Sequence, residues 1–365
     1  VVEPGVVNIK LSEATAPYGL QFVPDPSSQK VCTIGGNVAE NAGGPHCLAY
    51  GVTTNHVLGV EVVLADGSVA WLGGPARETP GYDLRGVFVG SEGTLAIATK
   101  IAVRLVPVPE AVHTTVATFM RMDDASQAVT DIVASGIVPA ALEMMDHTAI
   151  TAVEPAYHPG YSLEADAVLL VEVDGLRETV EEQAPRIEDI CRANNATDMW
   201  NATEPRQREQ LWAARKGAFG AFGNLAPNYS MADGVVPRTK LPEIMRRVQD
   251  IAAEIELTIA NVFHAGDGNL HPCILFDERK PGDVEKVIAG NGRILEACVA
   301  AGGALSGEHG IGIEKQEFLP LVFTEADMAA MARLKPAFGA GDSLNPSRLF
   351  SPPKDPGAHT AQAKD

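Results

Sequence analysis

The feature that most constrains the fold is an order of apolar strands and amphipathic helices that occurs twice in the first two-thirds of the chain. The two strand–helix–strand units occupy, in order, residues 112–119, 122–136 and 138–145, then 166–175, 177–195 and 196–200. The strands are rich in valine and leucine, and the first helix starts with acidic residues and stops at a glycine. Two such units with an apolar central strand predict an α+β sandwich of ferredoxin-like type.

Residues 1 to about 107, which precede this region, differ in composition: they are rich in glycine, valine, threonine and turn signals. The dipeptide Asp66-Gly67 separates two apolar runs, which predicts a β-hairpin. A chain of 365 residues is too long for a typical single domain, and Pro107-Val108-Pro109 is a plausible linker.

These observations predict a first domain at residues 1–108 and a second at 109–330. Residues 353–365 are rich in proline, glycine, alanine and lysine, so we expect a disordered tail there.

Charge and cysteine content argue against several functional classes. The chain has 47 acidic and 28 basic residues, a net charge of −19, which argues against binding to nucleic acid or anionic membrane surfaces. Its five cysteines show no CxxC spacing and indicate thiols in a reducing compartment. No apolar run approaches the roughly 20 residues of a membrane helix, and no signal peptide is visible. We therefore expect a cytoplasmic protein without a transmembrane segment.

Two histidines flank a glycine-rich turn in HAGDGNLHPC, residues 264–273. Gly266 and Gly268 predict a tight β-hairpin that places His264 and His271 on paired strands, pointing the same way. Neighbouring imidazoles repel each other once protonated, so a shared divalent metal would justify the pair. Two hydrogen-bonded histidines of the core are the alternative, and this stretch alone leaves both open.

An acid and a base, Glu308 and His309, lie between glycines in SGEHGIGIEK, residues 306–315. Alone, this stretch fits a helix end with a polar turn as well as it fits a functional loop. Combined with His264 and His271, Glu308 completes an N,N,O ligand set that Zn²⁺, Mn²⁺ or Fe²⁺ accepts, with open positions for substrate. In a strand-like loop His309 cannot easily share that metal, so we expect it to be free as a general base.

A run of glycine and asparagine residues at 32–59 offers backbone amides that suit a phosphate-bearing or flat aromatic cofactor. Neither the Rossmann nor the P-loop fingerprint is present, and glycine-rich runs of this kind are more often ordinary turns than cofactor sites. A similar turn at 89–97 contains Glu92, which can bond a ribityl or adenine hydroxyl or cap a helix. Arg215 can clamp a carboxylate, although most arginines on helices are solvated.

Taken together, six ordered motifs resemble the FAD-linked 2-hydroxy-acid oxidoreductases of the vanillyl-alcohol-oxidase superfamily, which include glycolate oxidases and D-lactate dehydrogenases. The motifs are PDPSSQ (24–29), IGGNVAENAGGPHCLAYGVTTNHVLGVEVVLADG (34–67), GYDLRGVFVGSEGTLAIATKIAVRL (81–105), HAGDGNLHP (264–272), SGEHGIG (306–312) and LNPSRLF (344–350). The resemblance implies an α+β fold with an FAD-binding domain of vanillyl-alcohol-oxidase (PCMH) type. It also implies an α+β cap domain with an antiparallel sheet, and a return of residues 331–352 to the first domain.

The resemblance also assigns roles to individual residues. The positions expected to face the flavin or its phosphates are Pro24, Ser27, Gly35, Gly36, Asn37, Asn41, Gly44 and Gly51. Those expected on the adenosine side are Glu92, Gly93 and Ile97. His264, His271 and Glu308 match the family's metal ligands, His309 its proposed base, and Arg215 its substrate-carboxylate arginine.

The function implied by the resemblance is oxidation of a small 2-hydroxy acid, glycolate or D-lactate, to its 2-oxo acid, with FAD and a divalent metal (Zn, Mn or Fe). Electrons would pass to an iron–sulfur partner or a quinone. Possible partners are iron–sulfur and second flavin-type subunits, which can hold a cytoplasmic protein peripherally at the inner membrane.

Family members begin with a further glycine-rich loop around the FAD pyrophosphate, and this sequence starts after it, so we expect an N-terminally incomplete FAD domain. The sequence also leaves two alternatives to the oxidoreductase open. One is a metal-dependent hydrolase that uses the same two histidines and glutamate. The other is a truncated, non-catalytic subunit of a glycolate oxidase complex.

Overall fold

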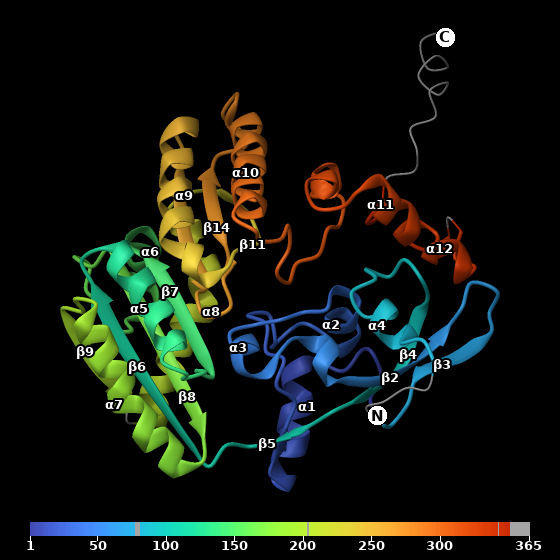
Figure 1. The fold of residues 1–365 in the computed structure, drawn as a ribbon, viewed down its shortest axis with the longest axis horizontal. Helices are drawn as coiled ribbons and strands as arrows, with labels where there is room; N and C mark the ends of the chain where they lie inside the picture. The colour runs from blue at the N-terminus through green and yellow to red at the C-terminus, as the bar shows by residue number, and fades with distance from the viewer. Residues whose placement is uncertain (77–80, 203, 342, 351–365) are drawn as a thin grey trace.

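The structure, a computed structural model, describes residues 1–76, 81–202, 204–341 and 343–350. Two lobes are joined by the short strand β5 (Val106–Pro107), which crosses between them in Figure 1. We call residues 1–107 the N-terminal lobe, residues 111–300 the cap lobe and residues 304–350 the return segment.

The N-terminal lobe is built on a three-stranded antiparallel sheet of order β3-β2-β4. Strands β2 (Val57–Val63) and β3 (Val69–Gly73) form the hairpin predicted at Asp66-Gly67, and Gly67 has the positive φ, +82°, that such a turn needs. Strand β4 (Ile97–Val103) pairs with the other edge of β2, and β1 (Leu20–Gln21) pairs with β5. The helices are α1 (Asn8–Thr15), α2 (Ile34–Glu40), α3 (Cys47–Tyr50) and α4 (Leu84–Phe88).

The cap lobe contains a nine-stranded sheet whose main path runs β10-β14-β12-β7-β8-β6-β9 with antiparallel pairing between neighbours. The strands are β6 (Ala111–Phe119), β7 (Ala141–Asp146), β8 (Ala167–Gly175), β9 (Asp198–Ala202), β10 (Asn228–Met231), β11 (Gly234–Val235), β12 (Thr258–His264), β13 (Asn269–Leu270) and β14 (Pro272–Phe276). The order β7-β8-β6-β9 is the ferredoxin-like arrangement that the two repeated units predict, and β12, β14 and β10 extend it at one edge.

Helices cover both faces of this sheet, which explains why β8 is apolar almost continuously rather than in alternation. One face carries α5 (Met122–Ala134), α7 (Arg177–Ala193), α9 (Leu241–Ile255) and α10 (Asp283–Ala300). The other carries α6 (His147–Tyr157) and α8 (Pro205–Ala221). On α8, Leu211, Ala214 and Arg215 share the buried face, so Arg215 is directed at the sheet and not at solvent.

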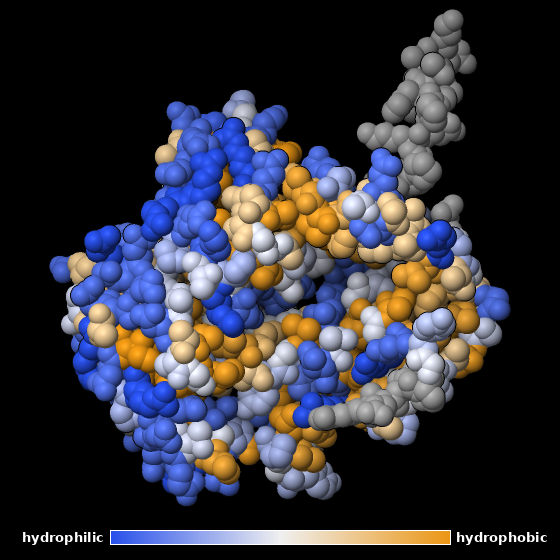
Figure 2. Space-filling view, viewed as in Figure 1, coloured by the Kyte–Doolittle hydropathy of each residue, from blue (hydrophilic) through white to orange (hydrophobic). Residues whose placement is uncertain are grey.

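The return segment leads from the cap lobe back to the N-terminal lobe. It begins beside β11, where Ala304 and Val235 form a bridge, and it includes α11 (Glu325–Ala332) and α12 (Leu334–Ala337). Phe338 then packs against the core of the N-terminal lobe, and Asn345 Nδ2 donates to the Glu92 carbonyl at 2.7 Å. Figure 2 shows a hollow near the centre of the drawn face, below the return segment.

No helix in the described ranges is long and apolar enough to cross a membrane. The predicted tail at 353–365 lies outside the described residues. The predicted boundaries at 108, 330 and 352 stay predictions.

Candidate active site

The hairpin predicted around HAGDGNLHPC is present, with one difference in how its glycines act. Strand β12 ends at His264, which pairs with Asn269 of β13 across the turn. Gly268 has the left-handed conformation (φ +78°), whereas Gly266 is a site of close packing against α3 and β7. His264 and His271 are not direct cross-strand partners, but their rings meet edge to face with centroids 5.0 Å apart.

The structure brings the three predicted metal ligands together. Glu308 Oε1 lies 3.4 Å from Nε2 of His264 and 3.4 Å from Nε2 of His271, and one ligand atom from each residue lies within 4.8 Å of the others. Both ring nitrogens of His271 and Oε2 of Glu308 are buried without a hydrogen-bond partner in the described part of the chain. The unpartnered atoms of His271 and Glu308 fit a divalent cation, whereas both nitrogens of His264 have carboxylate neighbours.

Electrostatics at this cluster keep Glu308 ionised. Burial alone would raise the pKa of Glu308, but the hydrogen bond from His264 and the charges of the nearby histidines lower it to about 2. Burial likewise opposes the charged form of His264, yet Glu143 and Glu308 hold the pKa of His264 well above its usual value. The cluster therefore presents a carboxylate to a cation at neutral pH.

A second carboxylate, that of Glu143 on β7, orients His264 from the side of the ring opposite Glu308. Both Glu143 oxygens accept from His264 Nδ1, at 2.8 and 2.9 Å, which leaves Nε2 directed at Glu308. A carboxylate on the far nitrogen of a ligand histidine fixes its tautomer and raises its basicity. No motif in the sequence points to Glu143; a lone acid within an otherwise apolar strand indicates a buried partner without identifying it.

Arg215 is the partner of Glu143. Its Nη2 forms an ion pair with Glu143 Oε2 and lies 3.5 Å from His264 Nδ1, and the side chain is fully buried. The structure therefore gives Arg215 a protein carboxylate as its partner. Nε and Nη1 have no hydrogen-bond partner among the described residues, so two donors stay unused.

His309 lies beside the same cluster, on a loop that is bent and not strand-like as expected, and its role as a free base stays a prediction. Residues 307–309 form a bend, so successive side chains do not alternate. The His309 ring stacks on His271 with centroids 5.0 Å apart, and its Nε2 lies 3.7 Å from Glu308 Oε1. Its side chain is 40% exposed, so it is accessible to a small molecule that enters the site.

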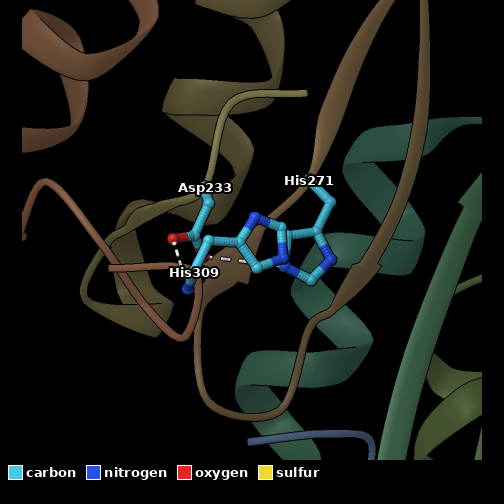
Figure 3. Close-up of side chains that lie close together, drawn as sticks. All are labelled: Asp233, His271 and His309. Atoms are coloured by element: carbon cyan, nitrogen blue, oxygen red, sulfur yellow. Dashed lines mark hydrogen bonds and ion pairs between the residues drawn. The ribbon is translucent and has the colours of Figure 1, made fainter. Parts of the chain in front are cut away.

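Asp233, His271 and His309 also lie close enough to share a cation (Figure 3). The Asp233 carboxylate, however, already forms an ion pair with the Lys315 ammonium at 2.8 Å. A carboxylate whose charge is balanced by a buried lysine is a poor metal ligand, so His264, His271 and Glu308 are the better candidate set.

A small cavity adjoins this cluster where the two lobes meet. Its volume is about 160 Å³, and its lining includes Gly43 and Cys47 from the N-terminal lobe and His264, Asn269 and Glu308 from the other side. Gly43 is required here, because a Cβ at this position would lie 2.7 Å from Glu308 Oε2. The loop at 41–44, one of the segments expected to face the flavin, therefore lies directly against the metal cluster.

The segments expected to face FAD are neighbours in the N-terminal lobe. Gly90 and Glu92 donate their backbone N–H groups to the carbonyls at 38 and 39 in α2, both at 2.8 Å. A Cβ on Gly44 would lie 2.6 Å from the Asp25 backbone, which joins the 24–29 segment to the same surface. The Asn37 amide nitrogen and the Ser91 hydroxyl are buried there without partners among the residues described, which fits a polar cofactor.

Comparison with known proteins agrees with this arrangement. Residues 108–349 match the family described as "FAD linked oxidases, C-terminal domain", and residues 1–73 match an "FAD binding domain". The chain belongs to the FAD-linked oxidases.

Individual relatives and structures agree with the family match. This FAD-linked oxidase is 45% identical over 347 residues to the glycolate oxidase subunit GlcD of Escherichia coli K12, covering 95% of this chain and 70% of the relative. It is 31% identical over 358 residues to a mitochondrial D-lactate dehydrogenase (cytochrome) of Arabidopsis thaliana, covering 96% of this chain and 62% of that protein. A crystal structure of p-cresol methylhydroxylase with substrate bound superposes with a TM-score of 0.75 at 15% identity, covering 96% and 76% of the two chains. This likeness confirms the predicted PCMH-type fold.

Several glycines of the FAD-linked oxidase that were expected to face the flavin have a protein neighbour where a side chain would extend. A Cβ on Gly35, Gly51 or Gly93 would lie under 3 Å from Pro4, Asn55 or Asn345, respectively. A Cβ on Gly36, in contrast, would make only an ordinary van der Waals contact, 3.5 Å from Thr33 Oγ1. Close approach of the chain to itself therefore already explains most of these glycines, and their contact with the flavin stays a prediction.

Among the other residues expected to face the flavin, some already have hydrogen-bond partners within the protein. Asn41 adopts the left-handed conformation (φ +52°), and its Oδ1 accepts from the Thr54 N–H. Glu92 accepts from the N–H groups of residues 311 and 312 and so ties the SGEHGIG loop to the N-terminal lobe. Ile97 is exposed, Pro24 is buried, and Ser27 lines a cavity of about 860 Å³ between the lobes.

Proposed function

We propose that this FAD-linked oxidase oxidises a small 2-hydroxy acid, glycolate or D-lactate, to the corresponding 2-oxo acid. The observation that supports it best is the convergence of His264, His271 and Glu308 beside a cavity of about 160 Å³, which His264 and Glu308 line together with Gly43 of the flavin-side loop. The relatives named as a glycolate oxidase subunit and a D-lactate dehydrogenase support this substrate class. Family membership leaves the hydrolase alternative without support.

His264, His271 and Glu308 would hold a divalent cation, Zn²⁺, Mn²⁺ or Fe²⁺, and the orphaned donors of this set fit such an ion. When bound, the metal supplies a Lewis acid that polarises the substrate 2-hydroxyl and lowers its pKa. Glu143 accepts from His264 Nδ1, so Nε2 is the nitrogen that would face the ion and would lose its proton when the ion binds.

His309 accepts the 2-hydroxyl proton in this proposal. Its partly exposed ring lies beside the ligand cluster, with Nε2 3.7 Å from Oε1 of Glu308, a residue that lines the adjoining cavity. When bound, FAD supplies the acceptor for the hydride that leaves the substrate Cα. The unpartnered Nε and Nη1 of Arg215 are available to bind the substrate carboxylate while Nη2 stays on Glu143.

We further propose a division into an FAD-binding domain at 1–108, a cap domain at 109–330 and a return to the first domain at 331–352. An iron–sulfur subunit or a quinone would take the electrons, and a second flavin-type subunit could complete a complex. The relative named as a subunit of glycolate oxidase supports such partners. A cytoplasmic location, peripheral at the inner membrane through these partners, goes with this proposal.

The test is anaerobic addition of glycolate or D-lactate to the flavin-loaded protein, followed by absorbance and by reduction of a dye acceptor. We expect the flavin to bleach, and we expect His264→Ala to abolish the bleaching. Turnover without any acceptor would favour a hydrolase. Stable binding to partner subunits without bleaching would favour a non-catalytic subunit.

A further inference from the structure

The loop that contains Glu308 and His309 wraps around one buried carboxylate, that of Asp233. Asp233 directly precedes β11 and is fully buried. Its Oδ1 accepts from the N–H groups of Gly307 and Glu308 at 3.1 and 3.2 Å. Its Oδ2 accepts from the His309 N–H at 3.0 Å and from the Ser306 hydroxyl at 2.7 Å. Three consecutive backbone donors thus converge on a single anion.

We propose that Asp233 is a positioning residue that holds Glu308 and His309 in their working arrangement before metal or substrate binds. This inference rests on the proposed function, because it concerns the predicted metal ligand and base. Successive N–H groups that point at one spot form an anion-binding concavity, which an extended chain cannot offer. The Asp233 carboxylate occupies that concavity permanently and so stabilises the bend.

The bend determines where the two functional side chains lie. The Glu308 N–H donates to Asp233, while the Glu308 carboxylate points to the two histidines, with Oε1 3.4 Å from Nε2 of both His264 and His271. The next residue, His309, places its ring flat on His271, 10° from parallel. In Figure 3 the Asp233 carboxylate lies beside the His309 backbone, and its Oδ1 also lies 3.7 Å from His271 Nε2. An extended loop would separate these two side chains onto opposite faces.

The position of Asp233 is itself fixed by its surroundings. Lys315, a buried residue of the same motif, donates its ammonium to Oδ2 at 2.8 Å and balances the charge. Ser306, which donates to Asp233, also accepts from the Gly310 N–H at 2.8 Å and closes the bend. Beyond the bend, Glu92 accepts from Ile311 and Gly312. Two carboxylates from different parts of the chain therefore hold consecutive stretches of one loop.

The test compares Asp233→Asn with Asp146→Asn in the full chain without metal. Asp146 is a matched control: it is a buried carboxylate that accepts from backbone N–H groups, of Ala149 and Asn261, away from the loop. Amide hydrogen exchange of a peptide covering 306–310 is measured for each variant. We expect exchange about tenfold faster in Asp233→Asn and unchanged in Asp146→Asn, because a neutral amide offers fewer and weaker acceptors.

A second readout is the affinity for added Zn²⁺ or Mn²⁺, which should be about 10- to 100-fold weaker in Asp233→Asn and unchanged in Asp146→Asn. Unchanged exchange at 306–310 in Asp233→Asn overturns the proposal, whatever happens to the melting temperature. If wild type binds neither metal but exchange is faster, Asp233 still positions the loop and the metal role of the proposed function fails. If Asp233→Asn does not fold, Asp233→Glu is measured instead, with the same two outcomes deciding.

Discussion

Two buried clusters of histidines and carboxylates in this protein use the same residue types in different ways. The metal cluster (His264, His271 and Glu308) leaves both nitrogens of His271 and one oxygen of Glu308 without partners. In the boundary cluster (Asp25, His46, Glu172 and Lys216), His46 Nδ1 lies 2.9 Å from Asp25 and its Nε2 3.3 Å from Glu172. Lys216 donates to the same Asp25 oxygen at 2.9 Å, and the other Asp25 oxygen, like one of Glu308, has no partner among the described residues, so the two clusters differ in their histidine nitrogens.

The boundary cluster joins the lobes, because Asp25 and His46 belong to the N-terminal lobe and Glu172 and Lys216 to the cap lobe. Burial opposes a charge on His46, but Asp25 and Glu172 outweigh it and raise the pKa of His46 to about 10. His46, whose two nitrogens both have anionic partners, is protonated and structural, whereas His271, whose nitrogens have no hydrogen-bond partner among the described residues, is available to a ligand. His264 also has two carboxylate partners, so it would release a proton on binding a metal. The use of the lone pairs separates these two roles better than the residue types do.

The largest expected effect tests this difference directly. His271→Ala should lower turnover of a 2-hydroxy acid about 1,000-fold, because the Lewis acid it helps to hold is worth several kcal/mol. His46→Asn should keep most of the turnover, because its contacts join the lobes and lie outside the metal cluster. Steady-state rates with a dye acceptor check both. Equal losses in the two variants would show that the comparison is wrong.

The next largest effect concerns the contribution of the buried Arg215–Glu143 ion pair to the stability of the fold. Arg215→Met removes one of the two charged partners of the fully buried Glu143 and leaves only His264, so the free energy of unfolding should fall by about 3–5 kcal/mol. Lys216→Met should cost less, because Lys216 and Asp25 are partly exposed to solvent whereas Arg215 and Glu143 are fully buried. Urea unfolding measures both.

A double variant is the control for this prediction. Replacing both Arg215 and Glu143 by Met removes the pair together, so no uncompensated charge stays buried and much of the lost stability should return. A double variant as unstable as Arg215→Met would mean that packing around the arginine, and not the unpaired charge, causes the loss.

Much of the fold could be predicted from the sequence, because its signals are local. The two strand–helix–strand units and the Asp66-Gly67 turn depend on apolar spacing and turn chemistry within a few residues. The extension of the sheet by β12, β14 and β10, and the helices α6 and α8 on its second face, depend on contacts between distant segments. No local pattern specifies these contacts.

The site divides in the same way. His264, His271 and Glu308 could be predicted because they belong to short motifs with characteristic spacing. Glu143 and Asp233 could not, because each is a single acid whose partners lie 121 and 73 to 82 positions away. The bend at 307–309 was missed for the same reason, since the carboxylate that stabilises it is remote in sequence.

The third prediction concerns the pH dependence of the boundary cluster. The pKa of His46 is raised from about 6.5 in the unfolded chain to about 10 in the folded one. The stabilisation is therefore complete below about pH 6.5 and is lost progressively as the pH rises from there through 10. Urea unfolding at a series of pH values should show this decline in wild type and a much flatter profile in His46→Asn. An equally steep decline in the variant would assign the loss to other groups.

The smallest expected effect is the gain in stability when a metal binds, which should involve the metal cluster and not the boundary cluster. A metal that binds only the folded protein, at about ten times its dissociation constant, adds about 1.4 kcal/mol to the free energy of unfolding. Zn²⁺ or Mn²⁺ should therefore stabilise wild type and His46→Asn equally in thermal unfolding, and a chelator should reverse the gain. His271→Ala should show no gain, because two ligands cannot hold the ion as three do. A gain that persists in His271→Ala and disappears in His46→Asn would place the metal in the boundary cluster, against the reasoning from unused lone pairs.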